Sequence, residues 1–229
     1  MRRRIFEEQG RDKKILMLDL NNTLLNDFKI WRLATDVLFR IFGKEPPTTE
    51  EFFKKYRGPV VDTYRAFGIK ITSEEIHKIF DSVYEAHRND FSLAPGAYDL
   101  LFTLPRKGFI IVLVTACGRE TAMNLLEKFE IQNAFDHLEF GAGDKFAAIK
   151  RLMLRERAEA GNCFYVGDSP SDMMHAKRAG VRAVAFLNGN IPEDLVLAEM
   201  PDYNARDFKE LLIMLEAWDV LENFRSPRF

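Results

Sequence analysis

The sequence predicts an α/β protein with a doubly wound parallel sheet and a small all-helical domain inserted after the first strand. Two observations support this fold class. Short, continuous apolar runs alternate with helical patterns, as expected for parallel strands that are covered on both faces. Residues 26–91 interrupt this alternation with amphipathic segments and no convincing strand. The interruption is therefore interpreted as a helical insert.

Four apolar runs are predicted to be strands, and three helical patterns separate them. The strands are expected at residues 14–20 (KILMLDL), 109–115 (FIIVLVT), 162–168 (NCFYVGD) and 181–187 (VRAVAFL). The helical patterns cover residues 118–130, 144–159 and 170–180, and a final helix is expected at 207–222. Strands that alternate with helices imply right-handed crossovers, and in such sheets ligands bind beyond the carboxyl ends of the strands.

The insert has its own helix signals. Thr48 with Glu51, and Thr72 with Glu75, have the spacing of a capping box in front of a helical run. We expect a core made of residues 1–25 and 92–229 and a helical domain made of residues 26–91.

The bulk composition indicates a globular protein of the cytoplasm. Hydrophobic residues make up 47% of the chain, charged residues 30%, and the formal net charge is −2, so no nucleic-acid or membrane partner is expected. No apolar run approaches the ~20 residues that span a bilayer. Cys117 and Cys163 border apolar segments and are expected to be reduced, and the histidines lack zinc-ligand spacing. The oligomeric state is left open.

Polar residues stand where the predicted strands end. Asp19 ends the first strand, Thr115 ends the second, Lys145 begins the helix after the next loop, and Asp168 with Asp172 follows the third strand. A parallel sheet collects these ends along one edge, so the sequence predicts one cleft with three carboxylates, a hydroxyl and an ammonium.

Each of these residues also has a simpler explanation. The whole role of Asp172 could be to complete a capping box with Ser169, and Thr115 could be an ordinary strand residue. Lys145 is harder to explain alone, because a cation in the first turn of a helix opposes the helix dipole. Together they indicate a site that transfers phosphate. Carboxylates are ligands for Mg²⁺, a lysine can hold a phosphate, and a carboxylate beside them can form an aspartyl phosphate.

At this point the sequence resembles the haloacid dehalogenase superfamily of phosphohydrolases, and the resemblance covers nearly the whole core. The first motif of that family, D-x-D-x-T-L after an apolar run, corresponds to LMLDLNNTL. The second corresponds to IIVLVT, the third to Lys145 and the fourth to GDSPSD. The resemblance implies a Rossmann-like core and a helical C1 cap, as in phosphoglycolate-phosphatase-like members, with small phosphate esters as substrates.

The resemblance also implies a role for each matching residue. Asp19 would be the nucleophile, while Thr115, the adjoining Ala116 and Lys145 would hold the phosphoryl group. Mg²⁺ would be bound by Asp19, by the backbone carbonyl of Asn21 and by Asp168, while Asp172 would bind it through water or orient another ligand. Asp27 is expected on the surface of the linker to the cap.

Asn21 departs from the family pattern. In the phosphatases this position is the aspartate that protonates the leaving group and activates water, which an amide cannot do at neutral pH. Asn21 should still point into the cleft beside Asp19, because residues i and i+2 of an extended segment face the same way. Three explanations stand: a deliberate replacement of aspartate, which the intact remaining motifs favour; a natural variant that uses substrate assistance or favours good leaving groups; and an inactive relative kept for binding or regulation.

Two other activities of the family fit less well. A dehalogenase needs no metal, so the clustered GDSPSD carboxylates argue against it, and a phosphonate-cleaving enzyme would need a cap lysine that nothing singles out. Within the insert, KKYRGPVVDTYRAFG is the candidate specificity loop, with Arg57 as a possible substrate contact. Arg57 could equally be a solvated residue at a helix end. For Cys117 and His175, packing is the expected role.

Overall fold

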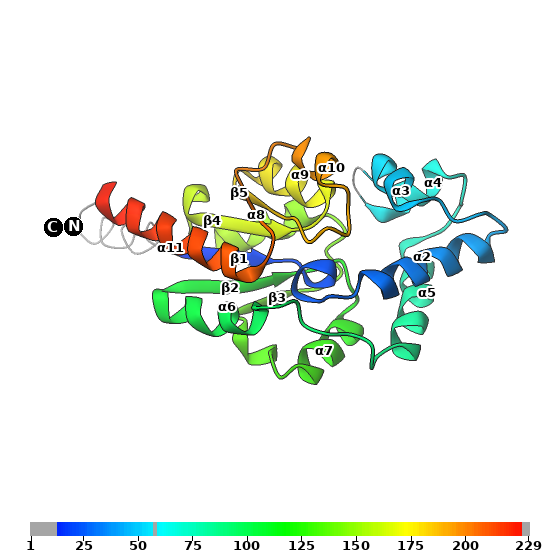
Figure 1. The fold of residues 1–229 in the computed structure, drawn as a ribbon, viewed down its shortest axis with the longest axis horizontal. Coiled ribbons are helices and arrows are strands. Elements are labelled where there is room, and N and C mark those ends of the chain that lie inside the picture. The colour runs from blue at the N-terminus through cyan, green and yellow to red at the C-terminus, as the bar shows by residue number, and fades with distance from the viewer. Residues whose placement is uncertain (1–12, 57–58, 226–229) are drawn as a thin grey trace.

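A parallel sheet of six strands forms the centre of the protein. The structure, a computed structural model, describes residues 13–56 and 59–225. The strands lie in the order β3-β2-β1-β4-β5-β6, which is the order of a doubly wound Rossmann sheet (Figure 1). They are β1 (Lys14–Leu18), β2 (Phe109–Val114), β3 (His137–Glu139), β4 (Cys163–Gly167), β5 (Arg182–Phe186) and β6 (Tyr203–Ala205). The predicted fold class is confirmed.

All four predicted strands are present, as β1, β2, β4 and β5, but two edge strands were missed. β3 and β6 each have three residues, and each pairs with only one neighbour, β2 and β5 respectively. Neither HLE nor YNA is an apolar run. A strand of three residues at a sheet edge is too short to show a hydrophobic period, so the pattern that identifies the four inner strands is absent here.

Helices cover both faces of the sheet. Along β1, Leu16 and Leu18 pack into one hydrophobic cluster while Ile15 and Met17 pack into the other. This alternation places one helical layer on each side, as Figure 1 shows. One layer contains α6 (Ala97–Thr103), α7 (Arg119–Lys128) and α11 (Phe208–Arg225), and the other contains α8 (Lys145–Glu156), α9 (Pro170–Ala179) and α10 (Glu193–Leu197).

A group of helices from the predicted insert stands beyond the carboxyl end of β1 (Figure 1). It consists of α2 (Phe28–Ile41), α3 (Thr49–Lys55), α4 (Val60–Ala66) and α5 (Ser73–Ala86). Both predicted capping boxes are present, at the starts of α3 and α5. The chain enters and leaves this group through two segments that pair with each other: Leu25 bridges Leu93, and the Asn26 amide donates to the Ser92 carbonyl at 2.8 Å. The exact domain limits stay a prediction.

Two further expectations concern the cysteines and membranes. Cys117 and Cys163 are both free thiols, as expected. No helix in the described part of the chain has the length and apolar character needed to cross a membrane.

Candidate active site

Asp19 stands at the point where β1 ends and the chain turns sharply. Its backbone amide donates to the Val166 carbonyl at 3.0 Å, so the ladder with β4 holds this residue in register. Its Oδ1 accepts a hydrogen bond from the Leu20 amide at 2.8 Å. The turn over Leu20–Leu24 then passes through Asn22 at φ 56°, a left-handed conformation that asparagine tolerates better than most residues. Asp19 is thereby fixed at the carboxyl end of the central strand.

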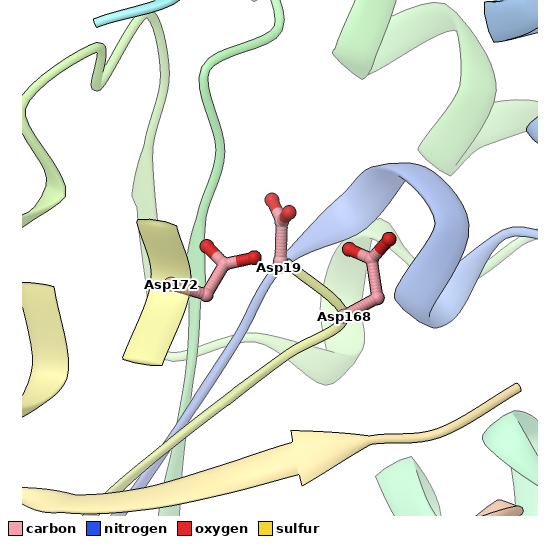
Figure 2. A group of neighbouring side chains, drawn as sticks. All are labelled: Asp19, Asp168 and Asp172. Atoms are coloured by element: carbon pink, nitrogen blue, oxygen red, sulfur yellow. The ribbon is translucent and has the colours of Figure 1, made fainter. Parts of the chain in front are cut away.

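Asp168 and Asp172 come from the neighbouring strand β4 and the helix that follows it. Figure 2 shows the carboxylates of Asp19, Asp168 and Asp172 pointing the same way from the end of β1, from the loop after β4 and from α9. One oxygen of each lies within 4.8 Å of the others, and all three residues are buried. The structure therefore places these three acids together, as the sequence predicted.

Asp172 does have the simpler role as well. Ser169 caps α9, and Asp172 Oδ2 accepts from the Ser169 amide at 3.1 Å and from its hydroxyl at 2.7 Å. The other oxygen, Oδ1, faces the cluster. Gly167 makes this arrangement possible, because a Cβ at that position would stand 2.4 Å from Asp172 Cγ. The glycine and the two acids of GDSPSD are thus one steric unit.

Lys145 supplies the positive charge of the cluster. Its Nζ lies 2.8 Å from Asp19 Oδ2 and 2.6 Å from Asp172 Oδ1, and its side chain is almost fully buried. The unfavourable place of a cation in the first turn of α8 is explained by these two carboxylates, which stabilise the charge at close range.

Burial and this single cation set the protonation of the group. Burial raises the pKa of Asp19 to about 6, although Lys145 opposes the rise. Burial also raises the pKa of Asp168 well above its usual range, and the charges of Asp172 and Asp19 add to the effect. For Asp172 burial acts in the same direction, but Lys145 and the Ser169 hydrogen bonds outweigh it and the pKa is lowered. Lys145 keeps a raised pKa because Asp172 and Asp19 outweigh its burial.

The cluster has the donor set for a hard divalent cation. Three buried carboxylates share one ammonium, so the cluster has more acidic groups than positive charge to pair with them. For Asp168, burial raises the pKa most, and the charges of Asp172 and Asp19 raise it further. A divalent ion with oxygen ligands would balance that excess. The residues present therefore fit a metal of this type.

Thr115 and Ala116 follow β2 and line the same cavity. Thr115 is buried, its Oγ1 accepts from the Cys117 amide at 3.1 Å, and its own amide donates to the Glu139 carbonyl at 2.9 Å. The cavity has a volume of about 150 Å³. Its acidic floor comes from the core and includes Asp19, Asn21, Thr115, Lys145, Asp168 and Asp172. Its roof is mostly apolar, comes from the helices of the insert, and includes Phe28, Trp31, Phe53, Ile76, Phe80 and Tyr84, with His77 and Asp81 of α5 among them.

Asn21 lines the cavity, and its side chain donates a hydrogen bond to Asp27, whose position was predicted wrongly from the sequence. Asp27 was expected on the linker surface, but it is 1% exposed. Its Oδ2 accepts from Asn21 Nδ2 at 2.6 Å and its Oδ1 accepts from the Asn22 amide at 2.5 Å. Burial raises the pKa of Asp27 to about 7, even though these hydrogen bonds lower it. Asp27 precedes α2 as a capping residue would, but its carboxylate turns back to the turn at Leu20–Leu24 instead.

Asn22 is a second residue whose role the sequence did not reveal. Its side-chain amide donates to Asp168 Oδ2, and its Oδ1 accepts from Asn190 at 2.7 Å and from Asn188 at 3.2 Å. These partners lie far apart in the chain, so no local pattern marks them. Arg57, the expected substrate contact of the insert, lies outside the described residues.

Comparison with known proteins adds to this geometry. The family model described as haloacid dehalogenase-like hydrolase matches residues 16–186. A phosphoglycolate phosphatase of Vibrio parahaemolyticus is 28% identical over 88% of this chain and 95% of its own length. A putative pyrophosphatase, PpaX, of Caldanaerobacter subterraneus is 27% identical over 89% of this chain and 91% of its own. The crystal structure of a hydrolase from Pseudomonas syringae superposes with a TM-score of 0.77 at 19% identity, covering 90% of this chain and 99% of that one.

Proposed function

Because this chain belongs to the haloacid dehalogenase-like hydrolase family, we propose that it is a magnesium-dependent phosphatase that hydrolyses a small phosphorylated metabolite through a phospho-aspartate on Asp19. The observation that supports this proposal most directly is the buried pair of Asp19 and Lys145 at 2.8 Å, with two further carboxylates beside it. The similarity to phosphoglycolate phosphatases of Vibrio points to the same class of reaction.

The proposed reaction has two steps. Asp19 attacks phosphorus, a new bond forms between its carboxylate oxygen and phosphorus, and the bond from phosphorus to the ester oxygen breaks with release of the alcohol. Water then cleaves the acyl phosphate, which returns the carboxylate and releases phosphate. Lys145, Thr115 and the backbone near Ala116 would hold the phosphoryl oxygens and stabilise the charge that develops on them. With a pKa of about 6, Asp19 is largely ionised at neutral pH, as a nucleophile must be.

Magnesium would be held by Asp19, Asp168, the backbone carbonyl of Asn21 and Asp172, the last through water or by orienting a ligand. When bound, it would neutralise phosphoryl charge as a Lewis acid. The three carboxylates that it would contact are those whose shared charge exceeds what Lys145 can balance.

Asn21 occupies the position from which the leaving group would receive its proton. An amide cannot supply it, and a missing general acid typically costs about 10²- to 10⁴-fold in rate. We therefore propose that the fully active form carries aspartate here and that this chain turns over slowly. The hydrogen bond from Asn21 to Asp27 supports a second candidate, a binding or regulatory protein, because the amide donor suits a buried carboxylate acceptor.

The variant Asn21→Asp tests the proposal. The introduced carboxyl would face Asp27 across the 2.6 Å contact, and two carboxyl groups so close share a proton, which raises the pKa of the pair and keeps an acid available near neutral pH. We expect Mg²⁺-dependent phosphate release from an alkyl phosphate ester to rise about 10²- to 10⁴-fold. The gain should be smaller for 4-nitrophenyl phosphate, whose leaving group needs less help from an acid.

Two controls make the result specific. Asn26→Asp introduces the same charge at an exposed position of the same loop and should leave the rate unchanged. Asp19→Asn in the Asn21→Asp background should abolish turnover. If Asn21→Asp releases no phosphate from any ester while a phosphate analogue binds both forms, the binding protein is the correct function.

A further inference from the structure

The roof of the cavity is built from stacked aromatic rings. Phe28 and Trp31, one turn apart on α2, stack with ring centroids 5.4 Å apart and planes 23° apart. Trp31 also stacks on Phe53 of α3, at 5.3 Å and 25°. Phe28 and Trp31 keep part of their surface exposed, whereas Phe53 is nearly buried. The stack therefore presents apolar ring surface to whatever lies between roof and floor.

The charges that line the cavity disfavour a substrate with a second negatively charged group. Among the described residues that line it, Lys145 is the only lysine or arginine, and two carboxylates already hold it at 2.8 and 2.6 Å. Asp81 of α5 adds a carboxylate on the roof side, where its Oδ1 accepts from the Thr121 hydroxyl at 2.6 Å. His77 of α5 also lines the cavity. A substrate group that carried its own negative charge would meet Asp81, the His77 imidazole and apolar rings, with no described lysine or arginine left to pair with it.

We propose that this cavity selects phosphate monoesters whose organic part is an uncharged group of about one ring, and that it discriminates against esters with a second anionic group. This inference rests on the proposed phosphatase function and names its substrate class. Phe28 and Trp31, which keep part of their surface exposed, offer a group of that size a ring face to pack against. Aromatic rings pack well against the edges and faces of such a stack.

Turnover by the Asn21→Asp variant in Mg²⁺ gives the first test. Benzyl phosphate and phosphoglycolate are both esters of primary alcohols, and they differ in the group that faces the roof. We expect kcat/KM to be about 10- to 200-fold higher for benzyl phosphate. This is the range by which differences in apolar contact with a pocket change kcat/KM. 4-Carboxybenzyl phosphate separates charge from shape and should lose most of that advantage. Equal or better use of phosphoglycolate would overturn the proposal.

Binding gives a second test that does not depend on turnover. The unsubstituted chain with Mg²⁺ is titrated calorimetrically with benzylphosphonate and with phosphonoacetate, which cannot be hydrolysed. A dissociation constant at least about tenfold lower for benzylphosphonate is expected. If that preference is found but no ester is hydrolysed by any variant, the phosphatase function fails and the selectivity stands. If phosphonoacetate binds equally well or better, or if neither ligand binds, the selectivity is wrong whatever the turnover.

Variants assign the preference to the roof. Trp31→Ala should weaken benzylphosphonate about tenfold more than inorganic phosphate, and Leu33→Ala, at an exposed site of the same helix, is the matched control. Asp81→Asn should reduce the penalty on phosphonoacetate several-fold. If Trp31→Ala weakens benzylphosphonate and inorganic phosphate equally, the ring stack only supports the fold and the proposal is wrong.

Discussion

The floor and the roof of the cavity are opposite in chemistry although they face each other. The floor brings three carboxylates and one ammonium together at the carboxyl ends of parallel strands. The roof offers aromatic and aliphatic surface from helices that lie between β1 and β2 in the chain. The phosphoryl group is the same in every phosphate ester, so the floor can bind it in the same way for all substrates. The roof has to match the organic group, which differs between substrates.

This difference separates two kinds of mutational effect. A change in the floor alters charge balance in a buried site, so it should change stability and the chemistry of every substrate together. A change in the roof alters contacts with the organic group, so it should change the order in which substrates are preferred. Variants that fail to behave this way would break the comparison.

The largest effect is expected from Lys145→Met. The substitution keeps an unbranched side chain, one atom shorter, but leaves Asp19 and Asp172 buried without their counter-charge. Breaking a buried pair in this way typically costs about 3–5 kcal/mol, so the free energy of unfolding in urea with EDTA at pH 7 should fall by that order. Added Mg²⁺ should restore part of it, since the ion supplies positive charge to the same carboxylates.

Lys150→Met is the matched control for this experiment. Lys150 is an exposed lysine of the same helix, and its loss should change the free energy of unfolding by less than about 0.5 kcal/mol. If the two variants lose equal stability, Lys145 does not balance the negative charge of the floor. Floor and roof would then differ in the placement of their residues but not in how charge contributes to stability.

The floor was predictable from sequence for a physical reason. A parallel sheet brings the carboxyl ends of its strands to one edge, so polar residues at the ends of apolar runs meet whatever lies between them in the chain. Asp19, Thr115 and Asp168 were found by this rule, and the structure places them around one cavity. The two edge strands were missed because three residues carry no period.

The roof was not predictable in the same way. The sequence indicates helices in the insert, but Trp31, Phe53 and Phe80 belong to different helices, and apolar residues on an amphipathic helix normally pack inside. Which of them borders a cavity depends on how the helices dock over the sheet. Asp27 was misplaced for a related reason, since a loop closure of a few residues, not a hydrophobic pattern, turns its carboxylate inward.

Behind the floor, Asp27 should make stability depend on pH. Burial raises its pKa to about 7, from 3.8 in an unfolded chain, so between these values the folded state binds a proton that the unfolded state has released. Stability should therefore fall as pH rises from about 4 to 7, by about 1.4 kcal/mol for each unit of pKa difference. Asp19, with its pKa near 6, acts in the same direction in metal-free protein.

Asp27→Asn isolates this contribution. The amide keeps the shape and can still accept a hydrogen bond from the Asn22 amide, but it does not titrate. Urea unfolding in EDTA at pH 4.5 and at pH 7.5 should show a smaller loss of stability than in the parent chain. Asp99→Asn, an exposed control, should keep the parent's slope. An unchanged slope in Asp27→Asn would mean that the floor carboxylates alone cause the pH dependence.

The smallest effect is expected where roof and floor touch. The Tyr84 hydroxyl lies 3.4 Å from Asn21 Nδ2, a long contact between neutral groups, and Tyr84 is buried. Tyr84→Phe keeps the ring in the roof, so the free energy of unfolding should fall by less than about 1 kcal/mol in the parent chain. In the Asn21→Asp background the hydroxyl can donate to a carboxylate, and hydrogen bonds to charged groups contribute about 1.5–3 kcal/mol. A double-mutant cycle in urea at pH 8 should therefore show coupling between the two positions. The same loss of stability in both backgrounds would mean that the roof and the acid position act independently.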